Sequence, residues 1–210
     1  MSKRILLIRH GQTDWNVEGR WQGMTDVPLN ATGISQAKVL AEHLKERPVR
    51  TIFSSDLQRA AITAQLIGER LNVVPRYDQR LREINLGVFQ GLTYNEMSKQ
   101  HPVKVREMGE DYMGFVFPEG ESRRMLQDRA YEFWQSVIVH EPGPEIAIVT
   151  HGGWIRALLL KLFPDEGSGG HGLSNTSVTL IDEEESGWKL AHIGSTAHLT
   201  EEGHINKDSL

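Results

Sequence analysis

The sequence contains no cysteine, and this absence excludes disulfide bonds, thiolate metal sites and a cysteine nucleophile. It also lacks a long apolar segment near its start, where residues 5–8 form the first apolar run. Such a run is too short for a membrane span or for the hydrophobic region of a signal peptide. We therefore expect a cytoplasmic protein without a membrane partner.

A surplus of positive charge is also missing, because the formal net charge at pH 7 is −5. Proteins that bind nucleic acids usually carry a basic surplus, so we expect no nucleic-acid partner. If the substrate is an anion, the cations that bind it must be gathered locally. The length of 210 residues suits one domain spanning residues 1–210. The sequence is compatible with a homodimer but does not indicate an oligomeric state.

The first apolar run leads directly into a polar motif. Residues 5–8 have the pattern of a buried strand, and Arg9, His10 and Gly11 follow at its carboxyl end, where open α/β sheets bind ligands. The guanidinium of Arg9 can bind two phosphate oxygens at once. A neutral His10 imidazole can attack phosphorus, and the Gly11 carbonyl can fix its tautomer. The alternative is a strand end with a solvated Arg–His pair.

Arg59 occupies an unusual place in the sequence. The segment that begins with Ser55 resembles a capping box that opens a helix reaching about Leu71. Arg59 then falls in the first helical turn, where the helix dipole disfavours a cation. An arginine there is easier to explain if it shares an anion with the helix terminus. The alternative is an exposed arginine beside Asp56.

A second strand–histidine–glycine arrangement occurs later in the chain. Residues 145–149 predict another buried strand, followed by His151, Gly152 and a helix over residues 154–163. This layout also places a histidine at the carboxyl end of a strand and beside a helix N-terminus. One such histidine is usually structural, but two in one chain favour a shared site.

The remaining pattern completes a fold prediction. Thr32 and Ser122 are expected to cap helices, and Thr93 to precede a short one. Further strands are expected at residues 50–54 and at the edge segment 73–77, and a closing hairpin at residues 177–182 and 188–193. We expect a loosely ordered polar tail from Thr200 onwards. This order predicts an α/β fold, a three-layer α/β/α sandwich with a mostly parallel central sheet.

The first motif also carries a family resemblance. Arg9, His10, Gly11, Thr13 and Asn16 form R-H-G-x-T-x-x-N, which resembles the signature of the histidine phosphatase superfamily, the phosphoglycerate mutase-like family. The resemblance extends from about residue 5 to about residue 198 and favours the broad-specificity, α-ribazole-type phosphatase branch.

Three further segments carry the same resemblance. The family's second arginine segment is similar to S-S-D-L-Q-R-A, which contains Arg59, and its second histidine motif to V-T-H-G-G, which contains His151. The segment at residues 81–91 resembles L-x-E-x-x-x-G-x-x-E-G, with Glu83 at the acidic position and Gln90 where glutamate is commoner.

By this resemblance the chain is a phosphomonoester hydrolase that works through a phosphohistidine on a small phosphorylated metabolite, with no metal or cofactor. His10 would be the nucleophile and Glu83 the general acid and base. Arg9, Arg59 and His151 would be the other catalytic residues. Read alone, Glu83 could equally be a solvated carboxylate paired with Arg80 or Arg82. The residues implied in binding the substrate are Arg9, His10, Asn16, Gln22, Gly23, Arg59, Glu83, His151 and Gly152.

Residues 101–120 are the least predictable segment, and two interpretations remain open. They form either a packed connector or a cap over the active site, and an irregular insert of this length favours the cap. The segment contains apolar and aromatic residues that would suit a leaving group with apolar surface: Tyr112, Met113, Phe115 and Phe117.

Three other functions compete with hydrolysis: a phosphoglycerate mutase, a non-catalytic phosphate-binding module and a metallohydrolase. The mutases that the chain resembles carry a tyrosine and a lysine after the acidic residue, and both are missing here. Lys104 and Arg106 in the following insert are offset by Glu107, Glu110 and Asp111. No H-x-H, H-E-x-x-H or paired-aspartate cluster supports a metal site.

Overall fold

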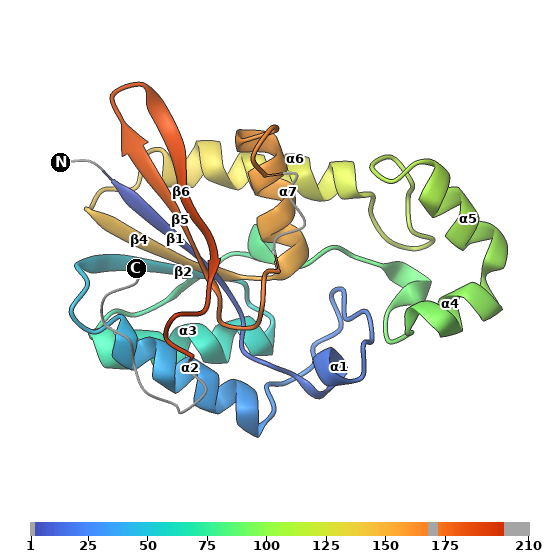
Figure 1. Ribbon diagram of the computed structural model, residues 1–210, viewed down its shortest axis with the longest axis horizontal. Helices are drawn as coiled ribbons and strands as arrows, with labels where there is room; N and C mark the ends of the chain where they lie inside the picture. Colours follow the sequence, from blue (N-terminus) through green and yellow to red (C-terminus); the bar gives the residue numbers. More distant parts are fainter. Residues whose placement is uncertain (1–2, 168–171, 200–210) are drawn as a thin grey trace.

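The computed structural model describes residues 3–167 and 172–199, and its centre is a mixed sheet of order β3-β2-β4-β1-β5-β6. Four neighbouring strands are parallel, and the last two pair antiparallel as a hairpin (Figure 1). The strands are β1 (Arg4–Arg9), β2 (Val49–Ser54), β3 (Arg76–Tyr77), β4 (Glu145–Thr150), β5 (Val178–Glu184) and β6 (Gly187–Ser195). The mostly parallel sheet predicted from the sequence is confirmed.

Helices cover both faces of this sheet. In Figure 1, α2 and α3 lie on one face and α6 and α7 on the other, while α4 and α5 lie away from the sheet. The helices are α1 (Asp14–Val17), α2 (Ala31–His43), α3 (Gln58–Leu71), α4 (Tyr94–Gln100), α5 (Pro102–Glu110), α6 (Arg123–Phe133) and α7 (Gly152–Leu162). The 3-10 turns Gln79–Leu81 and Gly87–Phe89 and a π-helical turn, Trp134–Ile138, complete the set. The three-layer sandwich is therefore confirmed.

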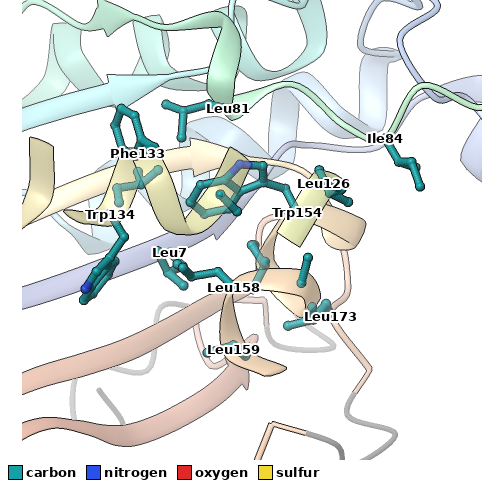
Figure 2. Packing of buried hydrophobic residues seen from close by; sticks show 14 of the residues in the cluster. Leu7, Leu81, Ile84, Leu126, Phe133, Trp134, Trp154, Leu158, Leu159 and Leu173 are labelled. Atoms are coloured by element: carbon teal, nitrogen blue, oxygen red, sulfur yellow. The ribbon is translucent and has the colours of Figure 1, made fainter. Parts of the chain in front are cut away.

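The core explains why residues 5–8 of β1 are all apolar. Successive side chains of a strand point to opposite faces, so Ile5 and Leu7 join one buried cluster and Leu6 and Ile8 join the other. Figure 2 shows Leu7 within the cluster that α6 and α7 share with the sheet. A strand buried on both faces has no position for a polar side chain until it ends, and β1 ends at Arg9.

The register of β1 and β4 brings the two histidine motifs to one level. Arg9 is paired with Thr150 in the parallel ladder. The next residue of each strand is a histidine, and the backbone N–H of His10 donates to the Thr150 carbonyl at 3.0 Å. His10 and His151 therefore leave the same edge of the sheet side by side.

Two predicted helix caps are wrong. Asn30, not Thr32, caps α2, because its side chain accepts from Gly33 N at 2.9 Å. The capping box predicted at Ser55 does not form, and α3 has no side-chain cap. Instead, the Gln58 N–H donates to Asp26 Oδ1 at 2.7 Å. The Ser55 hydroxyl is instead hydrogen-bonded to His151. A residue with the sequence pattern of a helix cap therefore binds a side chain that lies far away in the sequence.

Residues 101–120 are more regular than predicted. Helix α5 takes up the first half of the segment. Phe115 and Phe117 are buried, and the Phe117 ring packs edge-on against Phe89 with centroids 5.7 Å apart. These two aromatic residues are part of the buried core and line neither the cavity that contains His10 nor the smaller one beside it, contrary to the expectation that they face a leaving group.

The predicted loose tail from Thr200 lies outside the described residues. Within the described ranges, no helix has the length and apolar character needed to cross a bilayer.

Candidate active site

His10 is held as a neutral imidazole at the end of β1. Its side chain is 3% exposed, and Nδ1 lies 2.7 Å from the Gly11 carbonyl oxygen. A carbonyl oxygen only accepts, so Nδ1 carries the hydrogen and Nε2 carries the lone pair. Burial lowers the pKa of His10 well below its usual value, and the charges of Arg59 and Arg9 lower it further. The ring is thus in the form that can act as a nucleophile.

His151 is fixed behind His10. The two ring centroids are 5.2 Å apart, and the His151 side chain is fully buried. His151 Nδ1 accepts from Arg59 Nε at 3.2 Å, and Nε2 lies 2.9 Å from Ser55 Oγ. Because Nδ1 is an acceptor, Nε2 carries the hydrogen and donates it to Ser55. Burial, followed by the charge of Arg59, lowers the pKa of His151 well below its usual value.

Arg59 is a buried cation at the start of α3. Its Nη1 and Nη2 atoms donate to the carbonyls of Thr25 and Gly23, each at 2.7 Å, and Nε donates to His151. Burial lowers its pKa to about 10, against the raising influence of Glu83, so it stays charged at neutral pH. A guanidinium has five N–H groups, and three are used here. The exposed alternative for Arg59 is therefore wrong.

Arg9 lies next to Arg59 with part of its hydrogen-bonding capacity unused. Its Nη1 donates to the Leu173 carbonyl at 2.5 Å. Its Nε is buried without a partner among the residues that the structure describes. Burial is the main cause that lowers the pKa of Arg9, and Glu83 raises it. A buried N–H group without a partner is costly, so an anion bound here would satisfy it.

Two amide side chains in and after the first motif, those of Asn16 and Gln22, also have polar atoms that could bind a ligand. Asn16 Oδ1 accepts from Thr13 and, at 3.1 Å, from Asn175 Nδ2, which leaves the Asn16 amide nitrogen for a ligand. Gln22 Oε1 is buried, with no hydrogen-bond partner in the described part of the chain. Gly23 has a φ of +53°, and a Cβ there would lie 2.4 Å from Gln90 Oε1. The left-handed backbone and the close Gln90 side chain both favour glycine at this position.

Glu83 is held by the N-terminal turn of α7. Its Oε2 accepts from Gly153 N, and its Oε1 accepts from Ile84 N, both at 2.9 Å. A Cβ on residue 153 would lie 2.3 Å from Glu83 Oε1. The second glycine of the His-Gly-Gly motif thus allows the carboxyl group to approach the helix terminus. Arg80 and Arg82 pair with Asp78 and Asp56, so the interpretation of Glu83 as their salt-bridge partner is wrong.

A cavity of ≈ 240 Å³ joins these side chains. Of the predicted site residues, seven line it: Arg9, His10, Asn16, Gln22, Gly23, Arg59 and Glu83. His151 does not line the cavity but supports Arg59 and His10 from behind. Gly152 lies against Arg9, since a Cβ there would be 3.6 Å from Arg9 Nε. Among the described residues, no three histidine or carboxylate side chains are grouped as metal ligands would be.

Sequence reasoning missed several residues of this site. Asn175 Nδ2 donates to the His10 carbonyl at 3.1 Å, and Thr176 N donates to the Arg9 carbonyl at 3.0 Å. These contacts fasten the end of β1 to the loop before β5. Ser55 was mistaken for a cap. Arg123, the first residue of α6, lines the cavity and had no motif to single it out.

Comparison with known proteins places the chain in one family. Residues 5–196 match the family model of the histidine phosphatase superfamily (branch 1). The chain is 38% identical over 209 residues to phosphoglycerate mutase-like protein 4 of Arabidopsis thaliana, with 96% of this chain and 89% of that protein covered.

Two solved structures share both the sequence pattern and the fold. The mycobacterial glucosyl-3-phosphoglycerate phosphatase superposes with a TM-score of 0.81 at 35% identity, covering 92% of this chain and 100% of the other. The phosphoserine phosphatase of Entamoeba histolytica, in complex with 3-phosphoglyceric acid, gives a TM-score of 0.80 at 32% identity. That match covers 94% of this chain and 100% of the other.

Proposed function

This chain belongs to the histidine phosphatase superfamily (branch 1), and on that basis we propose that it is a phosphomonoester hydrolase with His10 as nucleophile. The observation that carries the proposal is the hydrogen bond from His10 Nδ1 to the Gly11 carbonyl at 2.7 Å. It directs the lone pair of the ring to Nε2, in a cavity that also contains Arg9 and Arg59.

The charge of the cavity suits a phosphomonoester. Such a group carries about −1.5 to −2 charges at neutral pH. Arg9 and Arg59 supply two positive charges, and neither forms an ion pair within the described ranges of the chain. The free N–H groups of both arginines and the Asn16 amide can donate to the equatorial phosphoryl oxygens, where negative charge is held in the transition state.

The reaction then takes two steps. In the first, His10 Nε2 forms a bond to phosphorus while the bond to the leaving oxygen breaks, and Glu83 gives that oxygen a proton. In the second, water attacks the phosphohistidine, Glu83 accepts a proton from the water, and His10 is restored as inorganic phosphate leaves. Gly153 N–H and Ile84 N–H hold the Glu83 carboxyl group in place during this exchange.

A mutase is the second candidate, because the relatives include a mutase-like protein as well as phosphatases. A mutase must keep water from the phosphohistidine and return the phosphoryl group to a second hydroxyl of its substrate. The tyrosine and lysine that the mutases carry after the acidic residue are replaced here by Leu86 and Tyr94. The cavity is partly open to solvent, and this openness favours water as acceptor.

The test combines turnover with detection of the intermediate. His10→Ala is expected to abolish hydrolysis of p-nitrophenyl phosphate and the acid-labile, base-stable phosphoenzyme formed by the wild type. His192→Ala is the matched control, because His192 is an exposed histidine of β6. Turnover by His10→Ala above a mock purification would refute the nucleophile assignment.

A second assay separates hydrolase from mutase. The protein is incubated with 3-phosphoglycerate and a trace of bisphosphoglycerate, and both products are followed. Free phosphate is expected to appear faster than 2-phosphoglycerate. The opposite order would make the chain a mutase, and no turnover of any phosphomonoester would leave a non-catalytic binding module.

A further inference from the structure

Arg123 stands at the junction of two cavities. It lines the ≈ 240 Å³ cavity that contains His10, and it also lines a neighbouring cavity of ≈ 70 Å³. The walls of the smaller cavity are mainly apolar and come from α6, α7, the loop after α5 and the segment before the turn Gly87–Phe89. The apolar and aromatic residues in them are Leu126, Ala157, Leu160, Tyr112, Met113 and Ile84. A leaving group that extends from the phosphate site towards α6 therefore meets Arg123.

The side chain of Arg123 is held in one conformation. Its Nη1 donates to the Tyr112 carbonyl at 2.9 Å, and its guanidinium carbon lies 4.0 Å from the centroid of the Tyr112 ring. The Phe117 ring is 5.3 Å away, and Met108 Sδ accepts from Nη2 at 3.8 Å. A guanidinium that is already fixed loses little further freedom when it binds a ligand.

This cation has no counter-ion of its own. Over residues 3–167 and 172–199, no carboxylate lies within 4.0 Å of its nitrogen atoms, whereas Arg129 of the same helix pairs with Glu121 at 2.6 Å. Arg20, another arginine that lines the larger cavity, is neutralised by Glu18 and Glu96. Burial among aromatic rings lowers the pKa of Arg123, because a charge without a partner is poorly stabilised there.

We propose that Arg123 is a specificity-determining residue, which selects phosphomonoesters whose leaving group carries a carboxylate. The proposal rests on the proposed function, since it assumes that Arg9 and Arg59 bind the phosphoryl group that is transferred. A single planar guanidinium matches a carboxylate in charge and geometry. A second phosphate would require more positive charge than Arg123 supplies. Arg156 also lines the smaller cavity, but it is exposed to solvent, so its field is weakened, although its charge still contributes to lowering the pKa of Arg9.

The proposal revises one expectation from the sequence. Residues 101–120 carry more carboxylates than cations, so the sequence predicts no positive field for a carboxylate in that segment. The cation comes instead from the residue that opens α6, just after the segment ends, and Tyr112 of the segment holds it in place. The segment 101–120 thus contributes to specificity through Tyr112, which orients Arg123 of the following helix.

The test compares two esters with the same carbon skeleton. In 3-phosphoglycerate the terminal carbon is a carboxylate, and in glycerol 3-phosphate it is a hydroxymethyl group. The wild type is expected to have the higher kcat/KM for 3-phosphoglycerate. Arg123→Leu should lower the ratio of the two kcat/KM values roughly 10- to 100-fold, as expected when a hydrogen bond to a charged group is lost. Arg123→Lys, which keeps the charge, should recover part of the ratio.

Arg124→Leu is the matched control, because Arg124 is the adjacent, exposed arginine of α6 and its side chain faces solvent. It should keep the wild-type ratio. If Arg123→Leu lowers both kcat/KM values equally, Arg123 only supports the fold and the proposal is wrong. It is equally wrong if the Arg123-dependent preference appears for fructose 1,6-bisphosphate over fructose 1-phosphate and not for 3-phosphoglycerate.

A binding measurement separates this proposal from the proposed function. In the His10→Ala background, calorimetric titration gives the dissociation constants of both glycerol-based esters without turnover. A preference for 3-phosphoglycerate that disappears in His10→Ala/Arg123→Leu supports the role of Arg123 even if the wild type hydrolyses nothing. The converse result is His10-dependent hydrolysis of p-nitrophenyl phosphate with no preference for 3-phosphoglycerate. That result would support the proposed hydrolase function and refute the role of Arg123.

Discussion

The Nε atom of Arg59 donates a hydrogen bond to Nδ1 of His151 at 3.2 Å, and both side chains are fully buried. The bond joins the first turn of α3 to the end of β4. It requires a neutral His151 with its hydrogen on Nε2, because a hydrogen on Nδ1 would face the Arg59 N–H. His151, which the family resemblance implies as a substrate ligand, thus also supports the arginine.

Arg59→Ala is expected to lower kcat by about 10²–10³, the usual cost of losing one preorganised donor group in a transition state. Arg59→Lys should recover little, because a lysine cannot bond to His151, Gly23 and Thr25 at once. The matched control is Arg70→Ala, at the other end of α3, where Arg70 forms an exposed pair with Glu42. Steady-state kinetics with p-nitrophenyl phosphate measures the effect, and a loss below tenfold for Arg59→Ala would contradict it.

Ser55→Ala is expected to act through His151. It removes the acceptor for His151 Nε2–H, and leaving a buried donor without a partner costs about 1–3 kcal/mol of stability. Nitrogen NMR of the imidazole rings should then report a changed His151 environment, together with a lower kcat. Ser54→Ala is the comparison, because the buried Ser54 hydroxyl donates to the Ser55 carbonyl and not to a histidine. An unaltered His151 signal in Ser55→Ala would refute the positioning role.

Glu83→Gln should affect substrates according to their leaving groups. An alkoxide needs a proton as it leaves, whereas p-nitrophenolate does not. The variant should therefore lose much more activity on glycerol 3-phosphate than on p-nitrophenyl phosphate. Rapid-quench measurements must separate formation of the phosphoenzyme from its hydrolysis, because Glu83 is expected in both steps. Equal losses in the formation step for both esters would exclude Glu83 as the general acid.

The pH dependence of stability follows from a histidine outside the cavity. Burial, with a smaller contribution from His43, lowers the pKa of His198 to about 4, against about 6.5 in the unfolded chain. Between these values only the unfolded chain binds the proton, so stability is lost as the pH falls below about 6.5. At pH 5 the loss from this residue is about 2 kcal/mol.

Urea unfolding at pH 7.5 and pH 5 measures that loss. Between these two pH values, the free energy of unfolding of His198→Gln should fall by about 2 kcal/mol less than that of the wild type. The effect of His10 and His151 on the pH dependence of stability should be the same in both proteins. His140→Gln, at an exposed position, should behave as the wild type does. An unchanged pH dependence in His198→Gln would show that this ring is not kept neutral by burial.

Activity is expected to survive EDTA, because the proposed reaction uses arginines where a metallohydrolase uses metal ions. Vanadate should inhibit as a mimic of five-coordinate phosphorus. Loss of activity in chelator that zinc or manganese restores would favour the metallohydrolase instead. Thermal unfolding with and without EDTA provides the control for an effect on folding.

The parts of the site that are local in sequence could be predicted. Arg9, His10 and Gly11 follow a strand that is apolar on both faces, and the same pattern recurs before His151. An apolar run of this kind indicates a strand that is buried on both faces. The polar residues that follow it must then lie at the carboxyl end of that strand, at the edge of the sheet. The family resemblance supplied Glu83, whose contact with Gly153 no local pattern reveals.

Residues that act at a distance could not be found in the same way. Ser55 has the sequence context of a helix cap, and only the fold shows that its hydroxyl serves His151. Arg123 lies in no motif, and the orientation of its guanidinium depends on the position of the Tyr112 ring. In both cases the local pattern was compatible with an ordinary structural role, and the partner lay on another element of the fold.

The pairing of Arg9 with Thr150 in neighbouring parallel strands has a consequence for how activity is acquired during folding. The two strands are separated by most of the chain, so their pairing closes a long loop and contributes to a high contact order. A partly folded chain that has formed only its N-terminal half holds His10 without His151 and without a fixed Arg59. Recovery of catalysis after dilution from denaturant should therefore lag behind recovery of helical circular dichroism, and the enzyme's own turnover becomes a reporter for closure of its central strand pair.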